Sequence, residues 1–260
     1  MKLENKNAII TGAAQGMGET ITKTLAREGA DIVLAARTKE PLEKIADEIR
    51  NMGRQAYVVP TDITDEKQVI NLVEKAKEAF DGRIDVLVNA AGATGPIETP
   101  VWEIEAEAFE RLLQINVTGV FLTTKHVIPT MIEQRAGKIV TIGGASGLKG
   151  YKNRAGYSSS KWAIRGLTRT TALDVGEFNI NINAIMPGIV ETPRMEKLCR
   201  EKAEKRGWEY DRVYQEYVSE MALKRVTTPQ DIANSVVFLA CDDSRNITGQ
   251  EIVVCGGWAV

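Results

Sequence analysis

The sequence has few of the residues that build metal centres and disulfide frameworks. Its 260 residues include one histidine, His126, and three cysteines, Cys199, Cys241 and Cys255, with no C-x-x-C spacing. An odd, unpatterned set of cysteines is typical of a reducing compartment. No group of His, Cys and Asp has the spacing of a metal site. We therefore expect no catalytic metal, no disulfide framework, and a structural role for His126.

Strong charge of one sign and long apolar runs are also lacking. Lys and Arg number 33 against 35 Asp and Glu, so the formal net charge is −2 and there is no general basic footprint for nucleic acid. No run reaches about 18 apolar residues, and the N-terminal MKLENKNAIITG has no apolar core of a signal peptide. We expect a cytoplasmic protein without nucleic-acid or membrane partners.

Short apolar strands alternate with helical patterns along the whole chain. The patterns predict strands at residues 7–11, 31–36, 55–60, 84–88, 138–142, 180–185 and 250–254. They predict helices at 16–28, 41–52, 65–80, 103–133 (one long helix or two abutting ones), 157–176, 194–223 and 229–240. Strands that are apolar throughout and separated by helices favour a parallel sheet buried on both faces. Right-handed crossovers then give an α/β, Rossmann-like doubly wound sheet of about seven strands, and we expect residues 1–260 to form a single domain.

The first predicted strand ends in the glycine-rich segment TGAAQGMG, which contains Gly12, Gly16 and Gly18. Glycine permits a tight turn, and the missing Cβ atoms let a pyrophosphate approach the N-terminus of the next helix. The spacing is G-x-x-x-G-x-G, not the commoner G-x-G-x-x-G. Its place between the first strand and the first helix favours dinucleotide binding, with Gln15 and Met17 between the glycines.

The end of the second predicted strand bears on the choice of cofactor. A carboxylate there would accept hydrogen bonds from the adenosine ribose of NAD and repel a 2′-phosphate. Ala35 and Ala36 occupy this point, followed by Arg37 with Lys39 close by. An arginine at this position favours NADP(H), with NAD(H) as the second choice.

Tyr157 and Lys161, in the segment YSSSK, lie four residues apart and share a face of a helix. A free tyrosine has a pKa of about 10 and is a poor acid or base at neutral pH. A nearby ammonium and a cationic nicotinamide would stabilise the phenolate and bring that pKa towards the working range. The pair therefore predicts proton transfer by Tyr157.

Seven segments together carry a resemblance to a known family. They are TGAAQGMG, PTDIT (60–64), NAAG (89–92), INVTG (115–119), YSSSK, PGIVETPRM (187–195) and NITGQEIVVCGG (246–257). In this order and spacing the chain resembles a short-chain dehydrogenase/reductase over nearly its full length. The resemblance implies that Tyr157 is the general acid/base and that Lys161 binds the nicotinamide ribose and lowers the tyrosine pKa. It also implies that Asn116 holds a water that links Lys161 to solvent.

The same resemblance assigns the rest of the cofactor site. Asp62 and Ile63 would contact the adenine, and Ile189 and Thr192 would hold the nicotinamide carboxamide. The remaining residues that would line the cofactor are Asn89, Ala90, Gly92, Pro187 and Gly188.

The segment GKIVTIGGASG departs from the family at one position, because Gly144 stands where the substrate-orienting serine is usual. Ser146 could supply the hydroxyl, a water or a substrate group could fill its place, or the chain could bind nucleotide without catalysis. Removing one preorganised donor costs roughly 10²- to 10³-fold, far less than the whole rate enhancement of an enzyme. We therefore favour catalysis with Ser146 as the donor.

Two segments are expected to set specificity. Residues 148–154 contain Lys149, Lys152 and Arg154, and residues 194–224 occupy the place of the family's substrate lid. Residues 194–206 hold six basic and three acidic side chains. Most of these charges should be solvated on amphipathic helices, and one or two cations would bind an anionic substrate.

The leading expectation is NAD(P)-dependent interconversion of a secondary alcohol and a ketone. One alternative is reduction of a 3-oxoacyl thioester, and a second is a catalytically inactive nucleotide-binding regulator, which Gly144 motivates. By the resemblance we expect a homotetramer, or failing that a dimer.

Overall fold

One sheet of seven parallel strands forms the centre of the molecule in this computed structural model, which describes residues 1–259. The strand order is β3-β2-β1-β4-β5-β6-β7, and each neighbouring pair is parallel. The strands are β1 (Asn7–Thr11), β2 (Asp31–Ala36), β3 (Ala56–Pro60), β4 (Val86–Asn89), β5 (Gly137–Ile142), β6 (Ile180–Pro187) and β7 (Glu251–Val254). The predicted single-domain, doubly wound sheet is confirmed; Val260, the last residue of the predicted range, lies outside the described residues.

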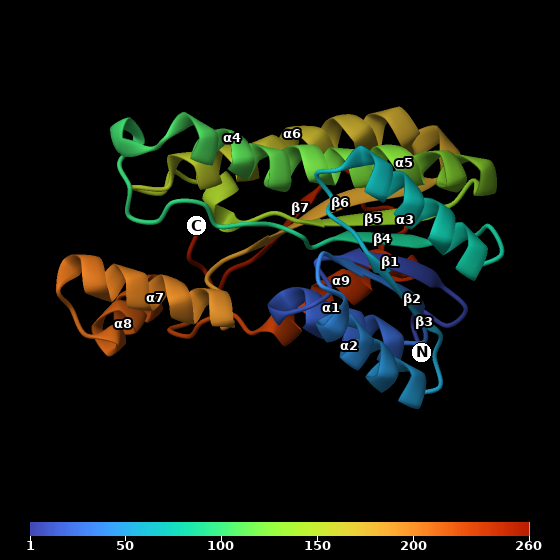
Figure 1. Cartoon of the computed structure of the whole chain (residues 1–260), viewed down its shortest axis with the longest axis horizontal. Coiled ribbons are helices and arrows are strands. Elements are labelled where there is room, and N and C mark those ends of the chain that lie inside the picture. The colour runs from blue at the N-terminus through green and yellow to red at the C-terminus, as the bar shows by residue number, and fades with distance from the viewer. Residues whose placement is uncertain (260) are drawn as a thin grey trace.

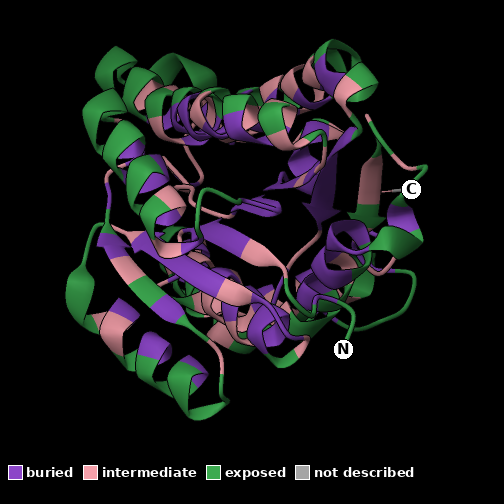
Figure 2. Cartoon of the chain, turned by 90° about the vertical axis from the view of Figure 1, so that its right-hand side faces the viewer, coloured by how far each residue is buried: buried purple, intermediate pink, exposed green. Residues whose placement is uncertain are grey.

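Helices cover both faces of the sheet (Figure 1). The helices are α1 (Gly16–Arg27), α2 (Lys39–Asn51), α3 (Glu66–Ala79), α4 (Ala106–Leu113), α5 (Gly119–Gln134), α6 (Ala155–Val175), α7 (Pro193–Arg206), α8 (Tyr210–Glu220) and α9 (Pro229–Ala240). α1, α2 and α9 pack on one face, and α3, α5 and α6 on the other. Figure 2 shows the central strands buried between these layers, while the outer helix faces are exposed. The edge strands β3 and β7 are partly exposed. The continuous apolar strands are therefore explained by burial on both sides.

The predicted helix at 103–133 is interrupted in the structure. A short 3₁₀ turn (Val101–Glu103) precedes α4, and a π-helical turn (Gln114–Thr118) joins α4 to α5. The π turn contains the buried Asn116, and such turns often occur at functional sites. α6 begins at Ala155, two residues before its predicted start, and β6 continues to Pro187 beyond its predicted end.

α7 and α8 form a helix pair that extends away from the sheet (Figure 1). The helical prediction for 194–223 is confirmed, with a break at Gly207, whose φ of 63° ends α7 in the left-handed region. The pair has its own apolar cluster, which includes Met195, Val213, Tyr217 and Trp258. Within residues 1–259, no helix is long and apolar enough to span a membrane.

The chain reverses its direction across the sheet between β1 and β4. β2 and β3 follow on one side of β1, and β4 to β7 continue on the other. In such sheets a crevice opens at the carboxyl ends of the two central strands. The turns after β1 and β4 therefore face a common ligand-binding edge.

Candidate active site

A groove with a cavity volume of about 480 Å³ lies at the β1–β4 edge. It contains most of the residues predicted to bind the cofactor: Gly12, Gln15, Gly16, Met17, Gly18, Arg37, Asp62, Ile63, Ala90, Gly92 and Thr192. Segments separated by up to 180 positions along the chain thus meet at one edge of the sheet. These eleven residues therefore line one groove, and their role in cofactor binding stays a prediction.

The turn after β1 allows the backbone at Ala91 to approach Gly12 closely and leaves room for an anion at the start of α1. Gly12 has a φ of 70°, and a Cβ at this position would lie 2.6 Å from the Ala91 nitrogen. α1 starts at Gly16, and the Gln15 side chain makes no capping hydrogen bond. The first N–H groups of α1 are therefore available at the positive end of the helix dipole, an arrangement that binds phosphate. The turn fits the pyrophosphate of a dinucleotide.

At the far end of the groove, Arg37 is exposed beside the partly buried Asp62. Burial opposes ionisation of Asp62, but hydrogen bonds from the Thr64 hydroxyl and N–H hold the pKa of its carboxyl below the ordinary value. Arg111 and Arg37 add to this effect. Asp62 is therefore ionised at neutral pH, and the two guanidinium groups leave this end of the groove cationic.

Several predicted cofactor residues do not line the groove. Asn89 is buried at the end of β4, where its amide accepts from the Thr123 hydroxyl at 2.7 Å and donates to Thr124 and Thr141. Its side chain thus braces β4 against α5 and β5. Pro187 ends β6, Gly188 and Ile189 follow it, and all three lie outside the groove lining. Tyr157 and Lys161, which were also predicted to bind the cofactor, are likewise not in the lining.

Tyr157 and Lys161 lie on one face of α6, as predicted, next to the end of β5. Lys161 is 6% exposed and donates from Nζ to the Ile142 carbonyl at 3.1 Å. The same Nζ lies 5.5 Å from the centre of the Tyr157 ring. Burial, with a smaller effect of Arg194, lowers the pKa of Lys161 to about 7. The lysine can therefore change its charge near neutral pH.

The two glycines after β5 differ in how much space a side chain would have at their positions. A Cβ on Gly143 would collide with the Met186 sulfur, so close packing requires glycine there. A Cβ on Gly144 would lie 3.4 Å from the Tyr157 hydroxyl, an ordinary contact. Ser146 lies beyond, in a 3₁₀ turn (Ala145–Gly147), and is buried. The position that faces Tyr157 is thus that of Gly144.

Asn116 is fixed by three hydrogen bonds from its π turn. Its amide oxygen accepts from the Ala93 N–H at 2.8 Å, and its Nδ2 donates to the Ala93 carbonyl and to Ser160 Oγ, both at 3.0 Å. Ser160 Oγ in turn donates to the Tyr157 carbonyl at 2.7 Å. Asn116 therefore connects the loop after β4 to the helix that carries Tyr157 and Lys161.

Two further side chains at the site were not singled out from sequence. Arg194, which was counted only among the lid cations, donates to the Gly92 carbonyl at 2.7 Å and so bridges the groove. Glu98, in the loop after β4, has a φ of 51° and accepts hydrogen bonds from Arg206. Nothing in a single sequence marks a loop carboxylate for such contacts.

Among the described residues, no three His, Cys, Asp or Glu side chains gather in a way that could hold a metal ion.

Comparisons with known proteins identify the class to which this fold and groove belong. Residues 6–203 match the family described as short chain dehydrogenase, and the chain therefore belongs to this family of oxidoreductases. It is 35% identical over 260 residues to the 3-oxoacyl-[acyl-carrier-protein] reductase FabG of Thermotoga maritima, with both chains fully covered.

Solved structures agree with this assignment. NAD⁺-bound xylitol dehydrogenase is 36% identical, with a TM-score of 0.94 and coverage of 99% of this chain and 100% of the other. An actinorhodin polyketide ketoreductase variant with NADPH is 30% identical, with a TM-score of 0.92 and coverage of 98% and 97%.

Proposed function

We propose that this protein is an NAD(P)-dependent oxidoreductase that interconverts a secondary alcohol and a ketone, with Tyr157 as the general acid/base. The observation that carries this function is that Tyr157 and the buried Lys161 lie together at the end of β5, beside β4, and the loop after β4 lines the groove of about 480 Å³. Neither side chain is itself part of the groove lining. A nucleotide groove alone would serve binding; a phenol and an amine beside it serve proton transfer.

Tyr157 exchanges the proton of the substrate. In alcohol oxidation its phenolate oxygen takes the hydroxyl proton, and in ketone reduction its O–H returns a proton to the alkoxide. The bound nicotinamide cofactor supplies the acceptor or donor of the hydride. The Lys161 Nζ lies 5.5 Å from the centre of the Tyr157 ring. Its low pKa lets Lys161 change its charge beside this ring near neutral pH.

Asn116 positions this machinery. It joins the loop at Ala93 to Ser160 on α6, within one turn of both Tyr157 and Lys161. The role expected from the family, a water held between Asn116 and Lys161, is part of the proposal.

NADP(H) is the favoured cofactor, with NAD(H) second. Arg37 and Arg111 make the far end of the groove cationic, which suits a 2′-phosphate. Asp62 and Ile63 would contact the adenine, and Thr192, at the start of α7, the nicotinamide end. The similar structures contain NAD⁺ in one case and NADPH in the other, so the preference rests on these residues.

Reduction of a 3-oxoacyl thioester is a second candidate. It is favoured by the 35% identity to FabG over the full length of both chains. Tyr157 and Lys161 would act on the 3-oxo group in the same way. The two candidates differ only in the part of the substrate that contacts the residues around the site.

An absorbance screen at 340 nm, with both cofactors and a panel of alcohols, free ketones and acyl thioesters, tests these functions. Wild type should turn over at least one class, and Tyr157→Phe should lose nearly all activity while it still binds cofactor. Turnover of thioesters alone would select the second candidate. No turnover despite tight cofactor binding would select the nucleotide-binding regulator and overturn the proposed function.

A homotetramer, or a dimer, belongs to the same proposal. Phe121 on α5 and Trp162 and Leu173 on α6 are large apolar side chains exposed on the outer helices, and their burial in a partner would stabilise an assembly. Light scattering of the purified protein measures the mass, and a monomer would contradict this expectation.

A further inference from the structure

Arg154 is a buried arginine whose guanidinium lies over the Tyr157 ring but has no carboxylate partner among residues 1–259. It directly precedes α6 and is 3% exposed. Its Nη1 donates to the Pro96 carbonyl at 3.4 Å, while its Nε is buried without a partner. In residues 1–259 no carboxylate oxygen lies within 4.0 Å of its guanidinium, whereas the neighbouring Lys202 and Arg206 are both paired with Glu98. A buried charge without a counterion is costly, so its retention calls for a functional reason.

The N-terminus of α6 makes this position still more electropositive. α6 has 21 residues, no capping side chain and no acidic residue in its first turn. The positive end of its dipole therefore adds to the field of Arg154. Ser158, in the same first turn, also has a buried hydroxyl without a partner. Burial lowers the pKa of the Arg154 guanidinium below its ordinary value, as expected for a cation lacking a counterion.

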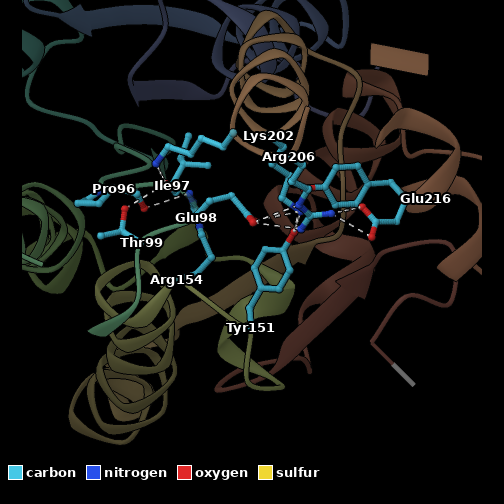
Figure 3. Close-up of polar contacts among 11 residues, drawn as sticks. Pro96, Ile97, Glu98, Thr99, Tyr151, Arg154, Lys202, Arg206 and Glu216 are labelled. Atoms are coloured by element: carbon cyan, nitrogen blue, oxygen red, sulfur yellow. Dashed lines mark hydrogen bonds and ion pairs between the residues drawn. The ribbon is translucent and has the colours of Figure 1, made fainter. Parts of the chain in front are cut away.

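The neighbouring acidic group is already occupied. Glu98 accepts from Arg206 at 3.1 and 3.2 Å and lies 3.6 Å from the buried Lys202 Nζ (Figure 3). Arg206 is shared with Glu216 at 2.8 Å. The carboxylates of Glu98 and Glu216 are thus paired with Lys202 and Arg206 of the lid. Neither carboxylate forms an ion pair with Arg154.

The other cations of segment 148–154 are less suited to recognition. Lys149 donates to the Trp258 carbonyl at 2.7 Å and lies 4.2 Å from the centre of that indole ring. Lys152 is exposed. Among these three residues, Arg154 alone combines burial with free donors.

We propose that Arg154 binds a carboxylate of the substrate, so that the substrate is a short oxo acid or the corresponding hydroxy acid. This rests on the proposed function. The Arg154 guanidinium carbon lies 4.7 Å from the centre of the Tyr157 ring, so a carboxylate held by Arg154 would lie close to the side chain of Tyr157. A carboxylate matches the parallel N–H groups of a guanidinium. An acyl thioester carries its charges on a distant carrier and does not meet this requirement.

Matched substrates and variants test this assignment. The substrates are 3-oxobutanoate and 4-oxopentanoate, each compared with its methyl ester; the variants are Arg154→Met and, as a control, Lys152→Gln. Wild type should prefer the acids by about tenfold or more in kcat/KM, since a hydrogen bond to a charged group has that effect. Arg154→Met should abolish the preference through a higher KM for the acids, with the esters unchanged. Lys152→Gln should keep it.

Thermal unfolding gives a readout that does not depend on turnover. Arg154→Met should melt at a higher temperature than wild type, because it removes an unpaired buried charge. With cofactor present, butanoate should raise the melting temperature of wild type more than butanamide does, and this difference should vanish in Arg154→Met. A merely structural arginine would give a lower melting temperature.

Besides a lower melting temperature of Arg154→Met, three results would overturn the role of Arg154. The first is equal wild-type efficiency on acids and esters. The second is an equal loss of kcat on both in Arg154→Met, which would mean that the arginine only positions Tyr157. If no compound is turned over, the proposed function fails on this panel and the melting experiment decides: no distinction between butanoate and butanamide then overturns carboxylate binding.

Discussion

The hydroxyl of Tyr157 faces Gly144. A Cβ on Gly144 would lie 3.4 Å from that oxygen and 3.5 Å from Lys161 Cγ, both ordinary contacts. Gly144 has an extended backbone, with φ 170° and ψ 144°, which any residue adopts. Position 144, where the family usually has a serine, therefore has room for a serine side chain and a backbone that serine can adopt.

Gly144→Ser should fold normally and raise kcat, because it adds a hydroxyl beside Tyr157. Removal of one such donor costs roughly 10²- to 10³-fold in other enzymes, so a gain of about tenfold is expected where part of this role is already filled. Steady-state kinetics on any substrate found in the screen measures it. Gly143→Ser is the control; its Cβ would collide with Met186, and the variant should melt at a lower temperature.

Ser146→Ala tests the donor predicted from sequence. If Ser146 supplies the hydroxyl, kcat should fall by about 10²-fold with the KM for cofactor unchanged, and Gly144→Ser should restore activity in the double variant. Wild-type activity in Ser146→Ala would contradict this role and leave a water or a substrate group as the donor.

Lys161→Met should be more stable than wild type without cofactor, most strongly at about pH 6. The folded-state pKa of Lys161 is about 7 against 10.5 unfolded, so below pH 7 the folded wild type carries a buried ammonium. Between these values the unfolded chain binds the proton more tightly, and wild-type stability rises with pH. The difference between the two proteins should thus shrink towards pH 10.5, as urea unfolding at several pH values would measure. A constant difference would contradict the low pKa.

Arg37→Gln should weaken NADP⁺ binding by about tenfold or more and change NAD⁺ binding little, because only NADP⁺ has the 2′-phosphate. Fluorescence titration of both nucleotides gives the two Kd values. Lys39→Gln is the matched control; Lys39 is exposed and lies 3.5 Å from Glu43 in an ion pair of its own helix. An equal loss of affinity for NADP⁺ and NAD⁺ would show that Arg37 does not bind the 2′-phosphate.

The sequence was sufficient for the architecture because the strands consist mostly of apolar residues and glycines follow β1, β4 and β5. Gly12 illustrates this, since its φ of 70° and its approach to Ala91 follow from the motif at 11–18. The directions of side chains did not follow in the same way. Asn89 belongs to a motif of the family, yet its amide braces β4 against α5. That orientation is decided by threonines 34 to 52 positions away in the chain.

The sequence also does not predict which of the charged side chains in the lid are buried. Arg206 and Lys202 carry no mark in sequence that separates them from the exposed Arg200 and Lys197. Their burial results from a contact with Glu98, about 100 positions earlier, in a loop whose left-handed residue no pattern predicts. Long-range pairing of this kind needs the fold itself.

Glu98→Gln should therefore destabilise the attachment of α7 to the loop after β4. Removing one member of a buried ion pair leaves the other charge unpaired, and here Lys202 would remain buried with the Tyr151 hydroxyl at 3.3 Å and the centre of the Tyr217 ring at 4.5 Å, but with no carboxylate. A loss of about 3 kcal/mol in the free energy of unfolding is expected. Glu196→Gln removes an exposed pair with Arg200 on the same helix and should cost far less, because water screens both charges. Urea unfolding compares the two, and equal effects would mean that Glu98 does not anchor the lid helices.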